Sequence, residues 1–140
     1  MTAEMVEPSN GLVISYNYLW AREYDRSEET GRKARPVCVQ IIVARGASGT
    51  VVALFPITSQ PLQPVRTAIE IPQTEARRIG LSITSWIVVD EWNLDDLAKS
   101  PHIADSHPIG ALSPAFMKRV RGEAAARIRA RRYRSVPRRR

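Results

Sequence analysis

The sequence predicts a mainly β fold, a small antiparallel barrel of five to seven strands followed by one C-terminal helix. Short runs rich in β-branched and aromatic residues recur across residues 11–89, and Gly or Pro separates them. With 140 residues, of which 44% are hydrophobic and 25% charged, the chain is long enough for one globular domain with a modest core. We expect a flexible leader over residues 1–10, a barrel domain over 11–130 and an Arg-rich tail over 131–140.

The first strand is expected within residues 11–20. Alternation along this stretch places Tyr16, Tyr18 and Trp20 on one face, which is typical of a half-buried strand. Residues 21–33 are charged, and we interpret them as a long mobile loop of the kind that often carries function.

A β-hairpin is predicted next. Two apolar runs, residues 37–44 and 50–55, flank a five-residue Gly-containing loop at 45–49. Antiparallel pairing around this loop brings Arg35 and Thr58 to the same end of the hairpin. A guanidinium beside hydroxyl groups is a suitable receptor for a phosphate, although an arginine before a strand is more often simply solvated.

Two further strands are predicted at residues 67–71 and 81–89. Between them, residues 74–79 form either one helical turn or a polar loop, which Gly80 ends. Residues 93–108 are polar and broken by prolines, so we expect a loop there.

His102 and His107 both fall in this expected loop, and we place both on the surface.

The last predicted element is a helix. Ser113 followed by Pro114 is a helix-start signal, because a capping hydroxyl precedes proline at the first helical position. An apolar stripe then recurs every four residues and could dock on the barrel. Its members are Phe116, Met117, Val120, Ala124 and Ile128. Beyond Ala130 we expect the Arg-rich chain to become disordered.

The net charge of +7 is unevenly distributed. From Lys118 to Arg140 eleven residues are Lys or Arg and only Glu123 is acidic, which gives this segment +10 and leaves −3 on residues 1–117. The basic tail could neutralise RNA phosphates, bind an acidic partner or simply aid solubility, and we favour the first.

Cys38 is the only cysteine, so neither an intramolecular disulfide nor a cysteine-cluster metal site can form. The sequence contains neither a secretory signal nor an apolar run of membrane-spanning length, and we expect a cytoplasmic protein without membrane association.

Seven short motifs, in order and with compatible spacing, resemble the PemK/MazF family of toxin–antitoxin ribonucleases. The resemblance covers about residues 11–120. It includes Glu28-Glu29 with Gly31, Arg35-Pro36-Val37, the strand end at 56–60, and Val88-Val89-Asp90-Glu91. Two departures stand out: Val88 occupies a position that is basic in some members, and Glu91 replaces a usual glutamine.

The resemblance implies an SH3-like barrel, usually a homodimer, that cleaves single-stranded RNA without a metal or other cofactor. A small acidic antitoxin would hold it inactive by filling the RNA groove. By the same resemblance Arg35 lies beside the scissile phosphate, Thr58 and Ser59 supply hydroxyls, and Asp90 is an acidic site residue.

Metal-free RNA cleavage uses the ribose 2′-hydroxyl as nucleophile, and it needs a proton acceptor and positive charge at the phosphate. Arg35 can supply the charge. We expect the acceptor to be Asp90 or a loop carboxylate, Glu28 or Glu29. Asp90 can equally be an ordinary carboxylate at the end of a strand, and for Glu28 and Glu29 a solvated loop position is favoured.

We add further RNA-binding candidates for their charge or their aromatic ring. Trp92 can stack a base, or it can belong to the core or a dimer interface. The remaining candidates are Arg32, Lys33, Arg131, Arg132 and Arg134.

Three hypotheses follow from the sequence: a metal-independent endoribonuclease toxin, a nucleic-acid-binding barrel that has lost cleavage, and an SH3-like protein-interaction module. We favour the first, because Arg35 and Thr58 are both present.

Overall fold

A computed structural model describes residues 8–29, 31, 33–45, 49–60 and 67–138. The fold is mainly antiparallel β with a C-terminal helix, as predicted. It contains eight strands in the described residues, more than the five to seven expected. In chain order the elements are β1 Leu12–Tyr16, α1 Ala21–Asp25, β2 Arg35–Arg45, β3 Gly49–Thr58, β4 Ala68–Glu70, α2 Gln73–Ile79, β5 Trp86–Val88, β6 Glu91–Asp96, β7 Ile103–Ala111, α3 Pro114–Arg129 and β8 Arg134–Pro137.

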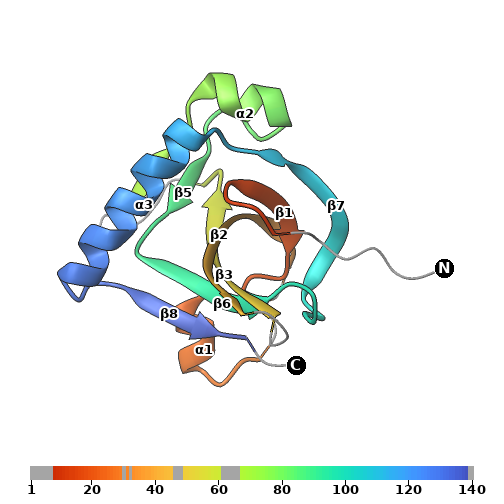
Figure 1. Cartoon of the computed structure of the whole chain (residues 1–140), viewed down its shortest axis with the longest axis vertical. Helices are drawn as coiled ribbons and strands as arrows, with labels where there is room; N and C mark the ends of the chain where they lie inside the picture. Colours follow the sequence, from red (N-terminus) through yellow and green to blue (C-terminus); the bar gives the residue numbers. More distant parts are fainter. Residues whose placement is uncertain (1–7, 30, 32, 46–48, 61–66, 139–140) are drawn as a thin grey trace.

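All strands belong to one sheet whose main path runs β4-β5-β3-β2-β1-β7, with β6 pairing with β3 and β8. Every pairing is antiparallel except the one between β6 and β8. In Figure 1, β1, β2 and β3 curl around the centre of the molecule, β6 and β7 pass around them, and α2 and α3 lie outside. Within the described residues β4 and β7 do not pair, so the sheet is strongly curled but open at these ends.

The predicted hairpin is confirmed. β2 and β3 pair antiparallel, with Val37 opposite Pro56 and Cys38 opposite Phe55. Successive side chains then enter two different cores, because strand residues alternate between the faces of a sheet. Cys38 packs in the core beneath α3, whereas Val37 packs in the core enclosed by the curled sheet.

Helix α3 covers one face of the sheet, as its stripe predicts. Ser113 caps its start, since the Ser113 hydroxyl accepts a hydrogen bond from the Phe116 backbone N–H at 3.2 Å. Four of the five stripe residues are buried; Ile128 is exposed. The buried members are Phe116, Met117, Val120 and Ala124.

Several expectations about loops are wrong. The expected loop at 21–33 contains α1, and the expected loop at 93–108 contains most of β6 and β7. The second segment is polar for two reasons. β7 pairs only with β1, at the end of the main path, where proline is tolerated. β6 instead buries polar side chains that have partners; Asn93, for example, both accepts from Leu19 N–H at 2.9 Å and donates to Leu19 C=O at 2.7 Å.

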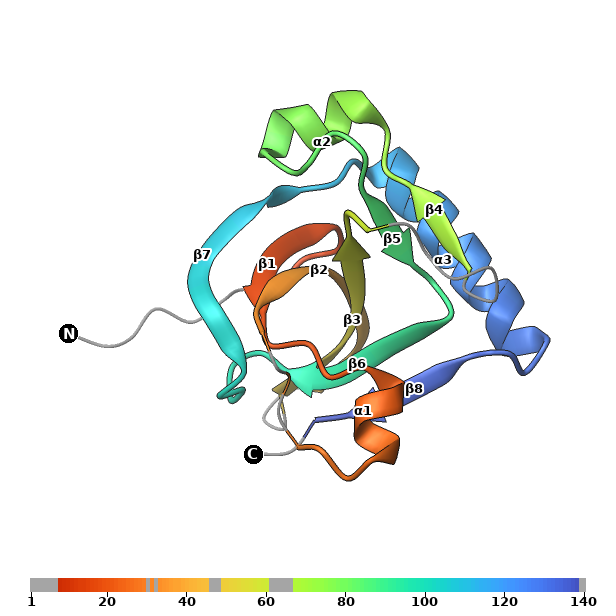
Figure 2. The same ribbon diagram turned by 180° about the vertical axis from the view of Figure 1, so that it is seen from behind.

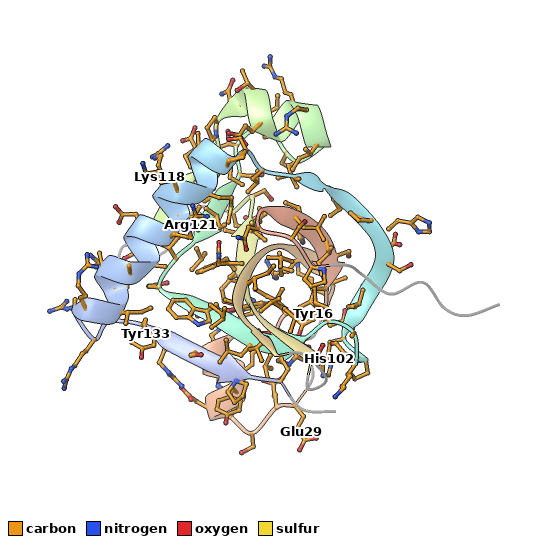
Figure 3. All side chains as sticks on the ribbon, in the orientation of Figure 1. Tyr16, Glu29, His102, Lys118, Arg121 and Tyr133 are labelled. Carbon is orange, nitrogen blue, oxygen red and sulfur yellow. The ribbon has the colours of Figure 1, made fainter. Side chains whose placement is uncertain are left out.

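His102 is buried, which corrects its expected surface position, whereas His107 is exposed as expected. The His102 ring lies edge-on to Tyr16, and the Tyr16 hydroxyl donates to Asp95 at 2.6 Å (Figure 3). Burial and the neighbouring Asp95 carboxylate raise the pKa of Tyr16 above its ordinary value.

The expected disordered tail is also wrong for the described residues 131–138. β8 pairs in parallel with β6, and it lies beside α1 in both ribbon views (Figures 1 and 2). Val136 is fully buried against Leu19 and Ala21, and Arg134 forms two hydrogen bonds with the Asp25 carboxylate at 2.7 and 2.9 Å. Residues 1–7 of the expected leader lie outside the described residues.

Candidate active site

A cleft of about 910 Å³ lies at the end of the hairpin. We call it the Arg35 cleft. It brings together the start of α1, the start of β2 and the end of β3 with the segment before β5 and with Ile109 of β7. Its lining residues are Trp20, Arg22, Lys33, Ala34, Arg35, Pro36, Ile57, Thr58, Ser59, Gln60, Gly80, Leu81, Ser82, Ser85 and Ile109.

Arg35 occupies the cleft as part of an aromatic–cation cluster. Its guanidinium carbon lies 4.9 Å from the centre of the Trp20 ring, and that of Arg22 lies 5.1 Å from it. Such contacts orient a guanidinium without neutralising its charge. The Nε of Arg35 is buried and has no hydrogen-bond partner among the described residues. The contact with Trp20 therefore holds Arg35 in the cleft without cancelling its positive charge.

The electrostatics of the cleft favour an anion. Burial lowers the pKa of Arg35, and the positive charge of Arg22 lowers it further, while Glu23 acts in the opposite direction. The charged form of Arg35 is thus incompletely compensated by its surroundings. A bound phosphate would supply the missing negative charge.

Thr58 lies two residues beyond the paired Val37 and Pro56, at the hairpin end that also carries Arg35. Its side chain is mostly buried, and its hydroxyl oxygen accepts a hydrogen bond from the Gln60 backbone N–H at 3.1 Å. This contact orients the hydroxyl and leaves its proton available for donation to a phosphate oxygen. Ser59 is exposed beside it. The structure thus places Arg35, Thr58 and Ser59, which the sequence assigns to one site, in the lining of the same cleft.

The segment that leads into Arg35 is held close to the end of β1. A Cβ atom on Gly31 would overlap the carbonyl oxygen of Tyr18 and would lie 2.7 Å from that of Asn17. From the C-terminus, buried Arg138 donates to the carbonyl oxygens of Asn17 at 2.6 Å and Glu29 at 3.4 Å. The glycine therefore permits a backbone contact that positions the cationic rim of the cleft.

We expect Gly31→Ala to destabilise the fold by about 1–3 kcal/mol, because the backbone must shift to accept the methyl group. Gly122→Ala is the matched control. Gly122 lies in α3, and a Cβ there would meet nothing within 4 Å, so this change should stabilise by up to about 1 kcal/mol. Urea unfolding measures both changes; equal midpoints for wild type and Gly31→Ala would contradict the close contact.

Three other predicted residues lie away from the cleft lining. Asp90 accepts a hydrogen bond from Thr67 N–H at 3.2 Å, and Glu28 and Glu29 do not line the cleft either. The structure therefore does not place these three carboxylates in the lining of the cleft that Arg35 occupies. No carboxylate or histidine occurs among the described residues that line the cleft.

Trp92 does not form an exposed stacking surface, which corrects that expectation. It is 6% exposed, packs 5.4 Å from Phe55 between ring centres, and is covered by Tyr133. The alternative that Trp92 belongs to the core is confirmed.

Of the basic candidates, Lys33 lines the cleft, whereas Arg131, Arg132 and Arg134 do not. Arg32 lies outside the described residues.

The sequence reasoning missed Trp20 and Arg22 as cleft residues. Trp20 falls at the end of the expected first strand, and Arg22 falls in the expected loop at 21–33. Glu23 offers the signal that was overlooked: it follows Trp20 by three residues, the spacing of a helix-start motif, and its carboxylate accepts from Trp20 N–H at 3.0 Å.

Searches against protein-family models, curated proteins and solved structures find no match to this chain. In the described part of the chain, no helix is long and apolar enough to cross a membrane. Nor do the same residues contain three or more His, Cys, Asp or Glu side chains placed to hold a metal ion.

Proposed function

We propose that this protein is a metal-independent endoribonuclease of the PemK/MazF toxin type, which cleaves single-stranded RNA in the Arg35 cleft. The observation that carries the proposal is the meeting of Arg35 and Thr58 in one cleft that is rimmed by cations. Arg22, Lys33 and Arg35 line it, and no described lining residue is acidic. This arrangement suits a phosphodiester of RNA.

In this proposal the 2′-hydroxyl attacks the adjacent phosphorus and the bond to the 5′-oxygen breaks, and water gives a proton to the departing oxygen. The products are a 2′,3′-cyclic phosphate and a free 5′-hydroxyl. Arg35 stabilises the additional negative charge of the pentacoordinate phosphate, and Thr58 donates a hydrogen bond to one of its oxygens. Because no described lining residue is a carboxylate or histidine, hydroxide takes the proton of the 2′-hydroxyl. Arg22 and Lys33 bind flanking phosphates.

The same charge makes the cleft a receptor for an acidic antitoxin segment, which would compete with RNA. A homodimer is part of this proposal, in keeping with the family resemblance.

The pH dependence of cleavage tests the catalytic part of the proposal. The described lining residues include neither histidine nor cysteine, the side chains whose ordinary pKa values fall between about pH 6 and 9. We therefore expect the single-turnover rate to rise about tenfold per pH unit across this range, following hydroxide concentration. The uncatalysed cleavage of the same RNA at each pH is the control.

A bell-shaped profile with a break between pH 5 and 8 would instead identify a side chain acting as base. That result would contradict the assignment of proton removal to solvent.

A second candidate function is a nucleic-acid-binding module that does not cleave. The lack of a carboxylate or histidine among the described lining residues favours it. Binding of RNA without any cleavage, at every pH tested, would select this function over the first.

A further inference from the structure

Tyr133 presents an aromatic ring at the surface between α3 and β8 (Figure 3). Tyr133 is 39% exposed as a residue, and its ring stacks on Trp92 with a distance of 5.2 Å between ring centres and an angle of 5° between planes. Trp92 in turn packs on Phe55 in the core. An exposed aromatic ring that is supported from beneath by the core is rigid, and rigidity lowers the entropic cost of stacking a ligand on it.

The chain on either side of this ring is strongly basic. Residues 127–132 include four arginines and no acidic residue, and Arg129, Arg131 and Arg132 are exposed. Lys118 and Arg121 continue the basic surface along α3 (Figure 3). Arg134, on the other side of Tyr133, is paired with Asp25. The charge around Tyr133 thus complements a polyanion.

Arg131 holds an unusual backbone conformation. Its φ is 56°, in the left-handed region, and it follows the C-terminal turn of α3, where Arg131 N–H donates to Ile128 C=O and Arg132 N–H to Arg127 C=O. Helices that end in this way usually have glycine at this position, because glycine adopts positive φ without a steric cost. Glycine would be the more stable residue at position 131. The presence of arginine there indicates that its side chain serves a function such as binding.

We propose that Tyr133, Arg131 and Arg132 form a second RNA site, in which a nucleobase stacks on Tyr133 and the neighbouring phosphates pair with the two arginines. An aromatic ring among arginines is the combination that binds single-stranded nucleic acid with little base preference. The inference rests on the proposed function for its ligand. It extends that function, since Tyr133 does not line the Arg35 cleft and an RNA strand must reach beyond the cleft to contact it.

The test measures binding of a fluorescent 12-nucleotide 2′-O-methyl RNA, which lacks a free nucleophile and stays intact. Tyr133→Ala should weaken binding about tenfold and Tyr133→Phe should preserve it, because the ring and not the hydroxyl provides the stacking. An oligonucleotide of the same length without bases should bind wild type and Tyr133→Ala equally. Lys99→Ala removes an exposed charge elsewhere and should change affinity less than twofold.

Arg131→Gly provides a variant whose folding is not in question. It should raise the melting temperature, since glycine relieves the backbone conformation, yet weaken RNA binding and lower the slope of log Kd against log salt by about one. A gain in stability together with a loss of binding is not expected of a residue whose role is only structural.

Unchanged RNA affinity in both Tyr133→Ala and Arg131→Gly would overturn this second site while leaving the Arg35 cleft intact as a proposal. Failure of wild type to bind RNA would overturn both. If wild type bound poly-glutamate but not RNA, the basic surface would belong to an acidic protein partner, and the inference of an RNA site would be wrong.

Discussion

Replacing Arg35 by alanine should lower the rate of RNA cleavage about 10³-fold while the protein stays folded. The guanidinium is held over Trp20, and Arg35 is less exposed than Arg22 and Lys33, the two other basic residues in the described lining of the cleft. Its removal takes away charge stabilisation that a phosphate needs most in the transition state. Single-turnover kinetics with a labelled RNA measure the loss, and circular dichroism verifies the fold.

Two further variants serve as comparisons for Arg35→Ala. Arg35→Lys keeps the charge but loses the planar donor pair, so its activity should fall between wild type and Arg35→Ala. Arg26→Ala removes an exposed arginine that does not line the cleft and should retain nearly full activity. If Arg35→Ala and Arg26→Ala cleaved at the same rate, Arg35 would have no catalytic role.

Deleting residues 131–140 should destabilise the whole fold by at least about 4 kcal/mol. The deletion removes β8, the fully buried Val136 and the buried Arg138 that binds Asn17 and Asn93. Burial of a valine contributes about 1.5–3 kcal/mol, and each hydrogen bond of a charged group about as much again. This loss is a large part of the 5–15 kcal/mol that stabilises a typical domain.

Urea unfolding monitored by fluorescence measures this effect. This truncation removes a strand of the folded domain as well as basic residues, so its effect on RNA binding would not report on charge alone. The charge contribution of the tail is better tested by Arg132→Ala, since the side chain of Arg132 is exposed. A truncated protein with an unchanged unfolding midpoint would contradict the integration of β8 into the fold.

The central hairpin could be predicted because two signals coincided. Its strands are continuous apolar runs, and the loop between them contains glycines. If the two strands pair antiparallel around the loop, their register places Thr58 at the same end of the hairpin as Arg35. The structure has this register, with Val37 opposite Pro56. The sequence therefore predicted that Arg35 and Thr58 lie at the same end of the hairpin.

The elements that the sequence did not predict are those whose residues, taken locally, are not typical of the helix or strand that they form. Helix α1 has only five residues, too few for a helical period to show, and it begins after Trp20 instead of a polar cap. β6 carries Glu91 and Asn93, whose burial is compensated by hydrogen bonds with the backbone of Ala21 and Leu19. Such compensation depends on residues about 70 positions away, which no local pattern reveals.

The sequence does not indicate β8, because the arginines in and around it are typical of a solvated tail. Val136 is its one aliphatic residue and it is fully buried, while Arg134 and Arg138 pair with Asp25 and Asn17. The basic composition at the C-terminus therefore serves both folding and surface charge. The missed strand also explains why Trp92 was misassigned, since Tyr133, just before β8, covers its ring.

Cleavage of single-stranded RNA by the purified wild-type protein in EDTA tests the central claim most directly. The substrate is one labelled RNA, compared with the all-deoxy strand of the same sequence. We expect cleavage of the RNA alone, with 2′,3′-cyclic phosphate and 5′-hydroxyl ends, because the 2′-hydroxyl is the nucleophile. An intact RNA in EDTA, equal cutting of the deoxy strand, or products with 3′-hydroxyl and 5′-phosphate ends would contradict a metal-independent ribonuclease in the Arg35 cleft.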